Sequence, residues 1–254
     1  MIRGLGYVQD AVDSRDWPIE QFGDGLYAAS KASLVQYAPS VLDQGRLNSC
    51  VAHAVASVVY ICHGLRGDPD PDLCSILFLW NLTRATEGTG TLNSGTSIRD
   101  CLKVLNDYGF CKEEAFPYDD RIDNTGAAFK VPPLSAIRQA FDQRVKFGTR
   151  RPAAYARLYN ADQIKTALTA NFPVILGLGV DIDFQAGRKT VVDKPMKNDG
   201  GHCMTVIGFE GDLFRVRNSW GKSWGDDGDC YFTEEALDVN KDVWMVTHAP
   251  EFSG

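Results

Sequence analysis

A cysteine at the start of an apolar run has the position of a reactive thiol. Residues 51–62 are apolar on nearly every face, as in a buried helix. Two residue types that cap helices, Asn48 and Ser49, precede the run, and Gly64 follows it. Cys50 is therefore predicted at the N-terminus of a core helix, where unpaired backbone N–H groups and the helix dipole favour a thiolate. Such a cysteine is a candidate nucleophile, although most unpaired cysteines are simply small buried hydrophobes.

A histidine and an asparagine are predicted to lie side by side on a β-hairpin. Two apolar runs, 203–209 and 213–217, flank Glu210-Gly211-Asp212, which has the composition of a hairpin turn. Pairing outward from that turn places His202 nearly opposite Asn218, close enough for a cross-strand contact. An asparagine oxygen that accepts from one imidazole N–H would fix the tautomer and aim the other ring nitrogen outward.

These residues are the parts of a site for nucleophilic acyl transfer. If the helix and the hairpin meet, the thiolate of Cys50 and the imidazolium of His202 stabilise one another, while Asn218 orients the ring. The imidazolium can then protonate a leaving amine. Acyl transfer also needs donors for the developing oxyanion, and the candidates are the side chain of Gln44 and the backbone N–H of Cys50. The chemistry indicated is amide hydrolysis through a covalent acyl-enzyme.

The spacing of these residues resembles that of the papain family of cysteine peptidases. The motifs are Gln44-Gly45 with Ser49-Cys50, then Gly-His202, then Asn218-Ser-Trp220-Gly-x-x-Trp224-Gly. The family's six-residue interval from Gln to Cys and sixteen-residue interval from His to Asn both hold. The resemblance implies that Cys50 is the nucleophile, His202 the general acid and base, Asn218 its orienting partner and Gln44 an oxyanion donor. It also implies that the indole of Trp220 shields the His–Asn contact from water.

A second stretch is similar to the family's Asn-Gly-Gly … Glu-Glu-x-Tyr-Pro-Tyr pattern. It reads Asn93-Ser-Gly95-Thr-Ser-Ile-Arg, followed by Glu113-Glu114-Ala-Phe-Pro117-Tyr118. In the family, the last glycine of the first motif hydrogen-bonds the substrate backbone as an added strand, and the next residues line the main specificity pocket. The resemblance thus implies a set of substrate-binding residues: Gly95, Thr96, Ser97, Gly177, Cys203 and Trp220. The small side chains of Thr96, Ser97 and Gly177 predict a pocket for a bulky apolar side chain two residues before the scissile bond.

The elements that must position the site fall into a helical half and a β half. Periodicity predicts helices at 51–62, 73–84 and 97–107, then β-type runs at 173–180, 203–209, 213–217 and 243–248, with a helix at 162–170. This order predicts an α+β fold with two lobes. The resemblance implies the papain-like form of that fold. It has a helical left lobe (about 44–130), an antiparallel β-barrel-like right lobe (about 131–250) and the active-site cleft between them.

The first 35 residues are too short and too polar for a domain of their own. Two interpretations stay open for this N-terminal segment. It is either a strap packed along the peptidase domain, residues 36–254, or a short pro-segment that lies over the cleft until it is removed or displaced.

Composition excludes several partners and cofactors. A net charge of −7 and a pI near 5.1 argue against nucleic acid or a membrane as partner, and no apolar run approaches a membrane span. The seven cysteines include no Cys-x-x-Cys pair, so neither a metal nor another cofactor is expected. Leu47 and Leu92 replace the cysteines of a family disulfide, which predicts an apolar contact and a likeness to disulfide-poor bacterial members. We expect a reducing environment, either cytoplasmic or reached without a general secretory signal.

The function that fits best is a cysteine-type endopeptidase acting on a peptide or protein substrate. Two alternatives stay open: a catalytically silent peptide-binding protein of the same fold, and an acyl transferase that passes the acyl group to an amine. Asn218 argues against the second, because transglutaminase-type enzymes use an aspartate as the third residue. His53, on the same helix as Cys50, is interpreted as a core histidine.

Overall fold

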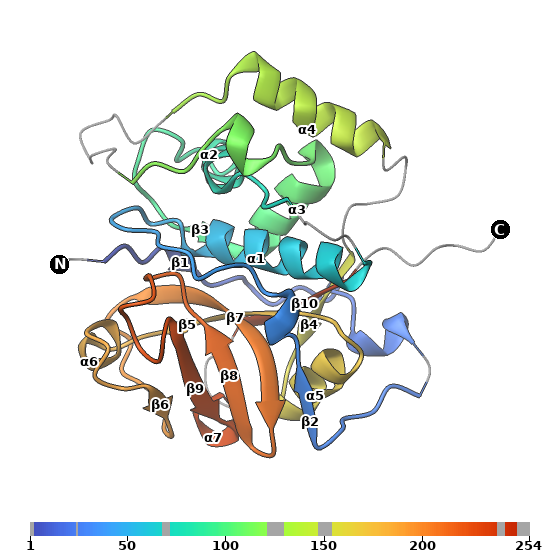
Figure 1. The fold of residues 1–254 in the computed structure, drawn as a ribbon, viewed down its shortest axis with the longest axis vertical. Helices are drawn as coiled ribbons and strands as arrows, with labels where there is room; N and C mark the ends of the chain where they lie inside the picture. The colour runs from blue at the N-terminus through green and yellow to red at the C-terminus, as the bar shows by residue number, and fades with distance from the viewer. Residues whose placement is uncertain are drawn as a thin grey trace.

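A helical lobe lies above a β-sheet lobe, and one helix, α1 (Cys50–Leu65), runs along their boundary (Figure 1). The structure is a computed structural model that describes residues 3–23, 25–67, 72–120, 130–146, 154–237 and 242–247. The arrangement confirms the α+β class and the order of a helical half followed by a β half.

The helical lobe is held by helices whose ends are set by local sequence. It contains α1, α2 (Ile76–Thr86), α3 (Ile98–Tyr108), α4 (Leu134–Lys146) and the 3-10 turn η3 (Glu113–Ala115). The Ser75 hydroxyl accepts from the N–H of Phe78 at 3.1 Å, and the Ser97 hydroxyl accepts from the N–H of Asp100 at 3.2 Å, so both serines act as N-caps. Gly109 ends α3 with φ at 74°, a backbone conformation that glycine adopts without strain.

The β lobe is an eight-stranded sheet among the described residues. The strands run in the order β4-β10-β5-β7-β8-β9-β6, β2 pairs with β7, and all pairs are antiparallel except β6 with β9. The bounds are β2 (Lys31–Ser33), β4 (Ala154–Leu158), β5 (Val174–Gly179), β6 (Val191–Val192), β7 (Gly201–Glu210), β8 (Leu213–Arg217), β9 (Asp229–Thr233) and β10 (Asp242–Thr247). Helices α5 (Ala161–Thr169), α6 (Ile182–Gln185) and α7 (Glu234–Leu237) accompany them. The described pairings form an open path rather than a closed barrel.

Helix α1 is apolar all round because both lobes pack on it. Helices α2 and α3 contact one side, and strands β5, β7 and β10 contact the other. The core around it joins side chains of the helical lobe to Ile175, Cys203, Trp244 and Val246 of the sheet. The N-terminus of α1, and Cys50 with it, therefore lies where the two lobes meet.

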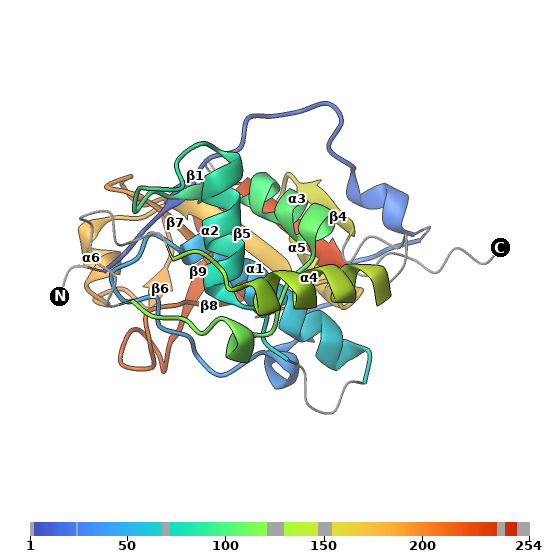
Figure 2. The same ribbon diagram turned by 90° about the horizontal axis from the view of Figure 1, so that it is seen from above.

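Three details differ from the sequence-based expectations. Helix α2 starts at Ile76 rather than at residue 73, because Cys74 forms an isolated β-bridge with Lys112. Helix α4 was not predicted, and it packs on α3 in the helical lobe (Figures 1 and 2), so the chain crosses to the β lobe after α4 rather than at residue 131. The expected contact between Leu47 and Leu92 is not supported, since Leu47 is fully buried while Leu92 is 58% exposed.

The N-terminal segment follows the body of the protein instead of folding on itself. Strand β1 (Tyr7–Val8) pairs in parallel with β3 (Thr96–Ser97) of the helical lobe, whereas β2 pairs with β7 of the β lobe. The 3-10 turn η1 (Ile19–Phe22) lies between β1 and β2 in the chain, and the 3-10 turn η2 (Val35–Tyr37) follows β2. The buried side chains of Ile19 and Leu34 belong to the core of the β lobe.

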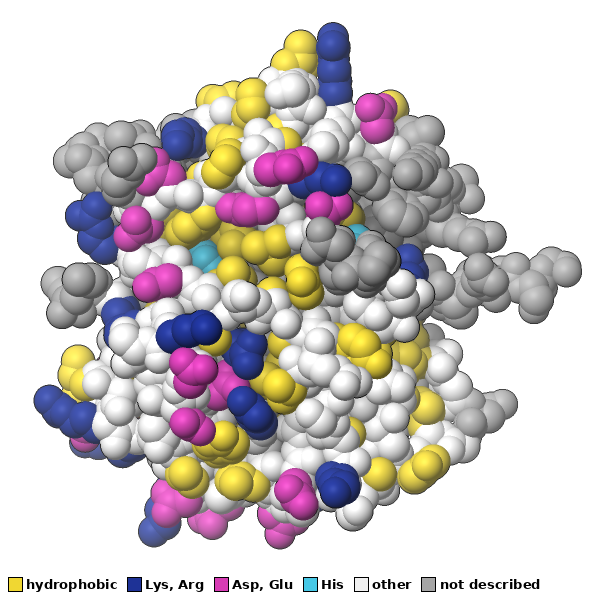
Figure 3. Space-filling model, viewed as in Figure 1, with side chains coloured by type: hydrophobic (Ala, Val, Ile, Leu, Met, Phe, Trp, Pro, Cys, Tyr) yellow, Lys and Arg dark blue, Asp and Glu magenta, His cyan; other side chains and the backbone are white. Residues whose placement is uncertain are grey.

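The surface carries charges of both signs. On the face in Figure 3, lysine and arginine side chains are scattered among acidic ones rather than gathered into one basic patch, in keeping with the net charge of −7. Of the helices in the described ranges, none has the length and apolar character that crossing a bilayer would require.

Candidate active site

Cys50 is the first residue of α1 and is fully buried. The hydroxyl of the preceding residue, Ser49, does not cap the helix but contacts the Tyr118 hydroxyl at 2.8 Å. The backbone N–H groups of Cys50, Val51 and Cys203 point at the thiol and lower its pKa, but burial outweighs them and raises the pKa to about 12. The helix N-terminus is thus arranged for a thiolate, whereas the burial of the thiol disfavours it.

His202 and Asn218 form the pair that the hairpin pattern predicted. His202 lies on β7 and Asn218 directly follows β8, and the His202 Nε2 and Asn218 Oδ1 atoms are 2.7 Å apart. Because an amide oxygen only accepts, Nε2 carries the proton and Nδ1 carries the lone pair. The Asn218 oxygen also accepts from the N–H of Ser219 at 2.7 Å, which fixes the amide. The Trp220 ring stacks on the imidazole, with centroids 4.1 Å apart and planes 20° apart.

The second imidazole nitrogen of His202 is buried close to the chain segment that contacts Cys50. Nδ1 of His202 is buried and has no hydrogen-bond partner within the described part of the chain. The sulfur of Cys50 accepts a hydrogen bond from the backbone N–H of Cys203, the residue that follows His202 on β7. Helix α1 and strand β7 therefore bring Cys50 and His202 into the same region. Burial lowers the pKa of the His202 imidazole to about 4. While both groups are buried, Cys50 is therefore a neutral thiol and His202 a neutral imidazole.

The buried Gln44 donates its side-chain amide to two backbone carbonyl oxygens. Its Nε2 donates to the carbonyl oxygen of Leu5 at 3.2 Å and to that of Leu47 at 2.9 Å. The other end of the amide is fixed, because its Oε1 accepts from the Ser219 hydroxyl at 2.7 Å. One of the two carbonyls that accept from Gln44 thus belongs to the N-terminal segment.

The carbonyl belongs to the strap, which we define as residues 3–10. Gly4 donates its N–H to the Gly45 carbonyl at 2.9 Å, and Trp220 Nε1 donates to the Gly4 carbonyl at 3.2 Å. Leu5 donates to Asn48 Oδ1 at 3.0 Å. The strap therefore lies on the residues that flank Gln44 and Cys50.

The backbone of Gly6 sits between the two lobes. Its N–H donates to the Gly201 carbonyl at 3.1 Å, and its carbonyl accepts from the N–H of Thr96 at 2.8 Å. A Cβ on Gly95 would stand 2.2 Å from the Gly6 oxygen. The glycine of the Asn-Ser-Gly motif is thus needed for a close backbone approach.

The structure brings most of the sequence-predicted substrate residues to the strap. Gly177 and Cys203 are paired across β5 and β7, and the Tyr7 ring lies against Gly177. Ser97 pairs with Val8, and its hydroxyl is also the cap of α3. Asp242, which accepts from the Tyr7 hydroxyl at 3.1 Å, was not predicted from the sequence. The available signal was an acidic residue opening an otherwise apolar strand.

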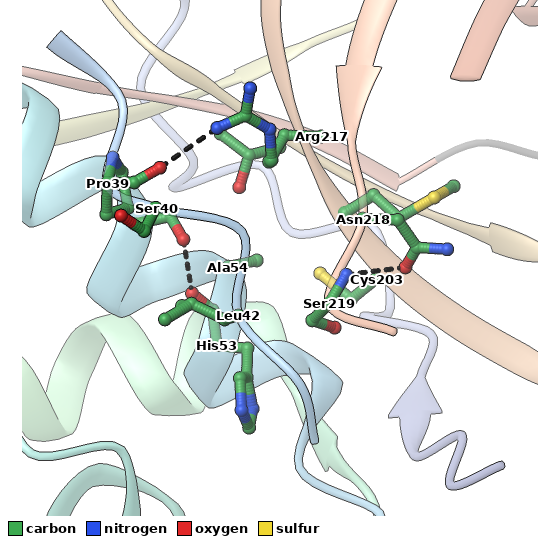
Figure 4. A pocket seen from close by; sticks show the side chains of 12 residues that line it. Pro39, Ser40, Leu42, His53, Ala54, Cys203, Arg217, Asn218 and Ser219 are labelled. Atoms are coloured by element: carbon green, nitrogen blue, oxygen red, sulfur yellow. Dashed lines mark hydrogen bonds between the residues drawn. The ribbon is translucent and has the colours of Figure 1, made fainter. Parts of the chain in front are cut away.

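His53 is a buried core residue with partners of its own. Its Nδ1 donates to the Ser49 carbonyl at 2.9 Å, and its ring meets the Tyr118 ring edge-on at 4.8 Å. Figure 4 shows the small hollow behind the site, with His53 on the α1 side and Asn218 on the strand side. Burial lowers the pKa of His53 to about 4, so it stays neutral at ordinary pH.

Comparison with known proteins agrees with this geometry. Residues 30–245 match the sequence model of a protein family with the description "Papain family cysteine protease". The chain is similar to an uncharacterized peptidase C1-like protein of Acanthamoeba polyphaga mimivirus, at 29% identity over 96% of this chain and 86% of that one. It is also similar to zingipain-2 of Zingiber officinale, at 26% identity over 74% of this chain and 79% of that one.

Solved structures give the same result for the fold. Xylellain, a cysteine protease from Xylella fastidiosa, superposes with a TM-score of 0.82 at 27% identity, covering 97% of this chain and 96% of that one. Procathepsin L 3 from the larval midgut of Tenebrio molitor superposes with a TM-score of 0.64 at 18% identity, covering 96% of this chain and 76% of that one. The first is a bacterial protein of nearly the same extent.

Proposed function

The chain belongs to the papain family of cysteine proteases, and on that premise we propose that it is an endopeptidase with Cys50 as its nucleophile. The observation that carries the proposal is the peptide carbonyl of Leu5 on Gln44 Nε2, beside the thiol and the His202–Asn218 pair. A substrate carbonyl in that place is held by an amide donor next to the helix N-terminus.

The chemistry runs through a thioester. The Cys50 thiol passes its proton to Nδ1 of His202, and the thiolate attacks the carbonyl carbon while the oxygen takes the electron pair. Gln44 Nε2–H and the Cys50 N–H hold that oxygen. When the tetrahedral intermediate collapses, the C–N bond breaks and the amine takes the proton from Nδ1. Water then gives a proton to Nδ1 and attacks the thioester, which releases the acid and restores the thiol.

The course of the strap supports cleavage within a chain rather than at its end. On one side of the Leu5 carbonyl, Gly4 contacts Gly45 and Trp220. On the other side, Tyr7 and Val8 pair with β3. A peptide thus has binding surface on both sides of the reacting carbonyl, which an endopeptidase needs.

The strap also supports a regulatory role for the N-terminal segment, as an intramolecular cover. Its hydrogen bonds use the same donors and acceptors that a bound peptide would use, so strap and substrate compete. Cys50 and His202 are buried while the strap is docked, and burial favours their neutral forms, in which the thiol is a weak nucleophile. Displacing the strap returns water to the cleft and with it the thiolate–imidazolium pair.

Covalent labelling tests the proposed nucleophile directly. We expect a peptidyl vinyl sulfone to add once per chain, at Cys50, and peptide mapping by mass spectrometry would locate the adduct. The other six cysteines are all buried and serve as internal controls. An adduct at another cysteine, or none even when the strap has been deleted, would contradict the proposal and favour a silent peptide-binding protein.

The strap is expected to bind less tightly as pH rises. Burial, and then the charge of Asp242, raise the pKa of Asp10 to about 6 from an ordinary value of 3.8, against the opposing contacts of Arg99 and Ser97. Its other charged neighbours are Glu87, whose pKa the charge of Asp10 helps to raise, and Arg157, whose guanidinium reaches the Asp10 carbonyl. The docked strap therefore holds a proton that the free strap releases. Its extra stability is complete below pH 3.8 and is lost as pH rises through about 6.

This linkage predicts a measurable change between pH 5 and pH 7. The activity of the full chain, divided by that of a chain lacking residues 1–10, should rise roughly tenfold over this interval. Division by the strap-free chain removes the pH dependence of catalysis itself. Asp10→Asn should flatten the ratio, and an unchanged slope in that variant would rule out Asp10 as the titrating group.

A further inference from the structure

Residues 89–95, which we call the substrate loop, lead into β3, the strand that binds a peptide backbone in this structure. The peptide is the strap: β1 pairs with β3, and Thr96 donates its N–H to the Gly6 carbonyl at 2.8 Å. A substrate that uses the same strand is aligned with Cys50 only as well as the substrate loop is held against the start of α1. The contacts between the loop and that helix therefore bear on the reaction.

Two asparagines join the substrate loop to the segment before Cys50. The backbone N–H of Asn48 donates to Asn93 Oδ1 at 2.9 Å, and Asn48 Nδ2 donates to the Asn93 carbonyl at 2.7 Å. Leu47 and Leu92, which were expected to make this connection, differ widely in burial, and none of the seven cysteines forms a disulfide. The connection at this place is therefore a pair of hydrogen bonds.

Buried side chains of α2 hold the backbone on both sides of the asparagine pair. Trp80 Nε1 donates to the Asn48 carbonyl at 3.0 Å and to the Ser94 carbonyl at 3.2 Å. The guanidinium of Arg84 lies 3.5 Å from the centre of the Trp80 ring and donates to the Leu92 carbonyl. Both side chains are fully buried, and packed side chains fix a loop more precisely than exposed ones do. The loop is thus held by α2 as well as by the segment that starts α1.

The two ends of the Asn48 amide have different partners. Its nitrogen binds the substrate loop, whereas its oxygen accepts from the N–H of Leu5 in the strap at 3.0 Å. In the Asn93 side chain it is the oxygen that binds Asn48. One asparagine therefore contributes a side-chain donor to the connection and the other a side-chain acceptor, so substitution can separate their roles.

We propose that Asn48 and Asn93 are positioning residues for peptide hydrolysis. Their hydrogen bonds hold β3, and with it the backbone of a bound peptide, at the distance from Cys50 that attack on the scissile carbonyl requires. The proposal rests on the peptidase function proposed above. It adds two residues that act through the alignment of the peptide and of the nucleophile.

The test compares two rates in the full chain and its variants. The first is kcat/KM for a fluorogenic tripeptide amide, whose backbone reaches β3. The second is the rate constant for alkylation of Cys50 by iodoacetamide, located by mass spectrometry. Iodoacetamide is too small to use β3, and both reagents require an open cleft. The ratio of the two rates is therefore independent of how often the strap opens and of the amount of folded protein.

The same chemical change should have opposite results at the two positions. Asn93→Ala removes the acceptor and should lower the ratio about tenfold, whereas Asn93→Asp keeps the acceptor and should hold the ratio within about threefold. Asn48→Asp keeps the oxygen that binds the strap but sets a second oxygen against the Asn93 carbonyl, so it should lower the ratio about tenfold. A general loss of stability would not distinguish the two aspartates.

Asn160→Ala is the matched control. The Asn160 side chain also accepts from a backbone N–H, that of Gln163 at 2.8 Å, but it caps α5 in the β lobe. This variant should keep the ratio of the unmodified chain. An unchanged ratio in Asn93→Ala and Asn48→Asp would overturn the positioning role and leave the peptidase function standing. Alkylation of Cys50 with no hydrolysis of the peptide, even in the chain lacking residues 1–10, would overturn both.

Discussion

Replacing Cys50 with alanine is expected to lower kcat/KM for a peptide amide by about 10⁴-fold or more. The thiol is the atom that bonds to the substrate carbon, and no other thiol described here lies at a helix N-terminus beside the His202–Asn218 pair. Without it, His202 and Gln44 can still polarise a carbonyl, but no acyl-enzyme forms. The loss is measured as steady-state hydrolysis of a fluorogenic dipeptide amide. The chain lacking residues 1–10 is assayed in parallel.

Cys230→Ala is the control for this substitution. Cys230 is an equally buried cysteine on β9, with its thiol on the Val216 carbonyl at 3.6 Å, and it lies in the core of the β lobe. The same small cavity is created, so the fold is perturbed to a similar degree while the activity should stay within about threefold. Residual hydrolysis by Cys50→Ala comparable to the unmodified chain would remove Cys50 from the mechanism.

Adding one methyl group to the strap is expected to activate the enzyme. A Cβ on Gly6 would stand 2.2 Å from the Asn48 oxygen and 2.8 Å from its Cα, and these backbone atoms cannot move aside as a flexible side chain would. Gly6 also has φ at 117°, which an alanine adopts only with strain. Gly6→Ala should therefore displace the strap from Gln44 and Cys50 without altering either residue.

The gain in kcat/KM equals the reciprocal of the fraction of chains whose cleft is open. If docking of the strap contributes about 2 kcal/mol, Gly6→Ala raises activity about 30-fold. The matched control is Gly25→Ala, because Gly25 also has a positive φ, 73°, but has no atoms within 4 Å of an added Cβ. Equal activity in the unmodified chain, both variants and the chain lacking residues 1–10 would mean that the strap does not limit access.

Much of the candidate site was predictable because it rests on local patterns. Cys50 starts a helix whose position follows from a continuous apolar run and a turn on either side. His202 and Asn218 belong to one hairpin, so the count of residues from the turn nearly fixes their register. The real register includes an irregularity between Val206 and Gly208, which a count cannot foresee, yet the pair still meets at 2.7 Å.

The helix α4 was missed because its signal is weak. Its buried face offers two alanines, Ala136 and Ala140, among side chains that are mostly polar or exposed. Helix α4 belongs to the helical lobe because it packs against α3. No periodic pattern of residues in the sequence indicates that tertiary contact.

Motifs and their spacing were enough to predict the family, the fold class and the candidate residues Cys50, His202, Asn218 and Gln44. Only the tertiary structure placed the Leu5 carbonyl on Gln44 and the Tyr7 hydroxyl on Asp242. The two members of the second contact are 235 residues apart, and neither belongs to a repeating pattern that points to the other. Such contacts exist because several strands and a helix pack at once, so their geometry is a property of the assembled core and not of any single segment.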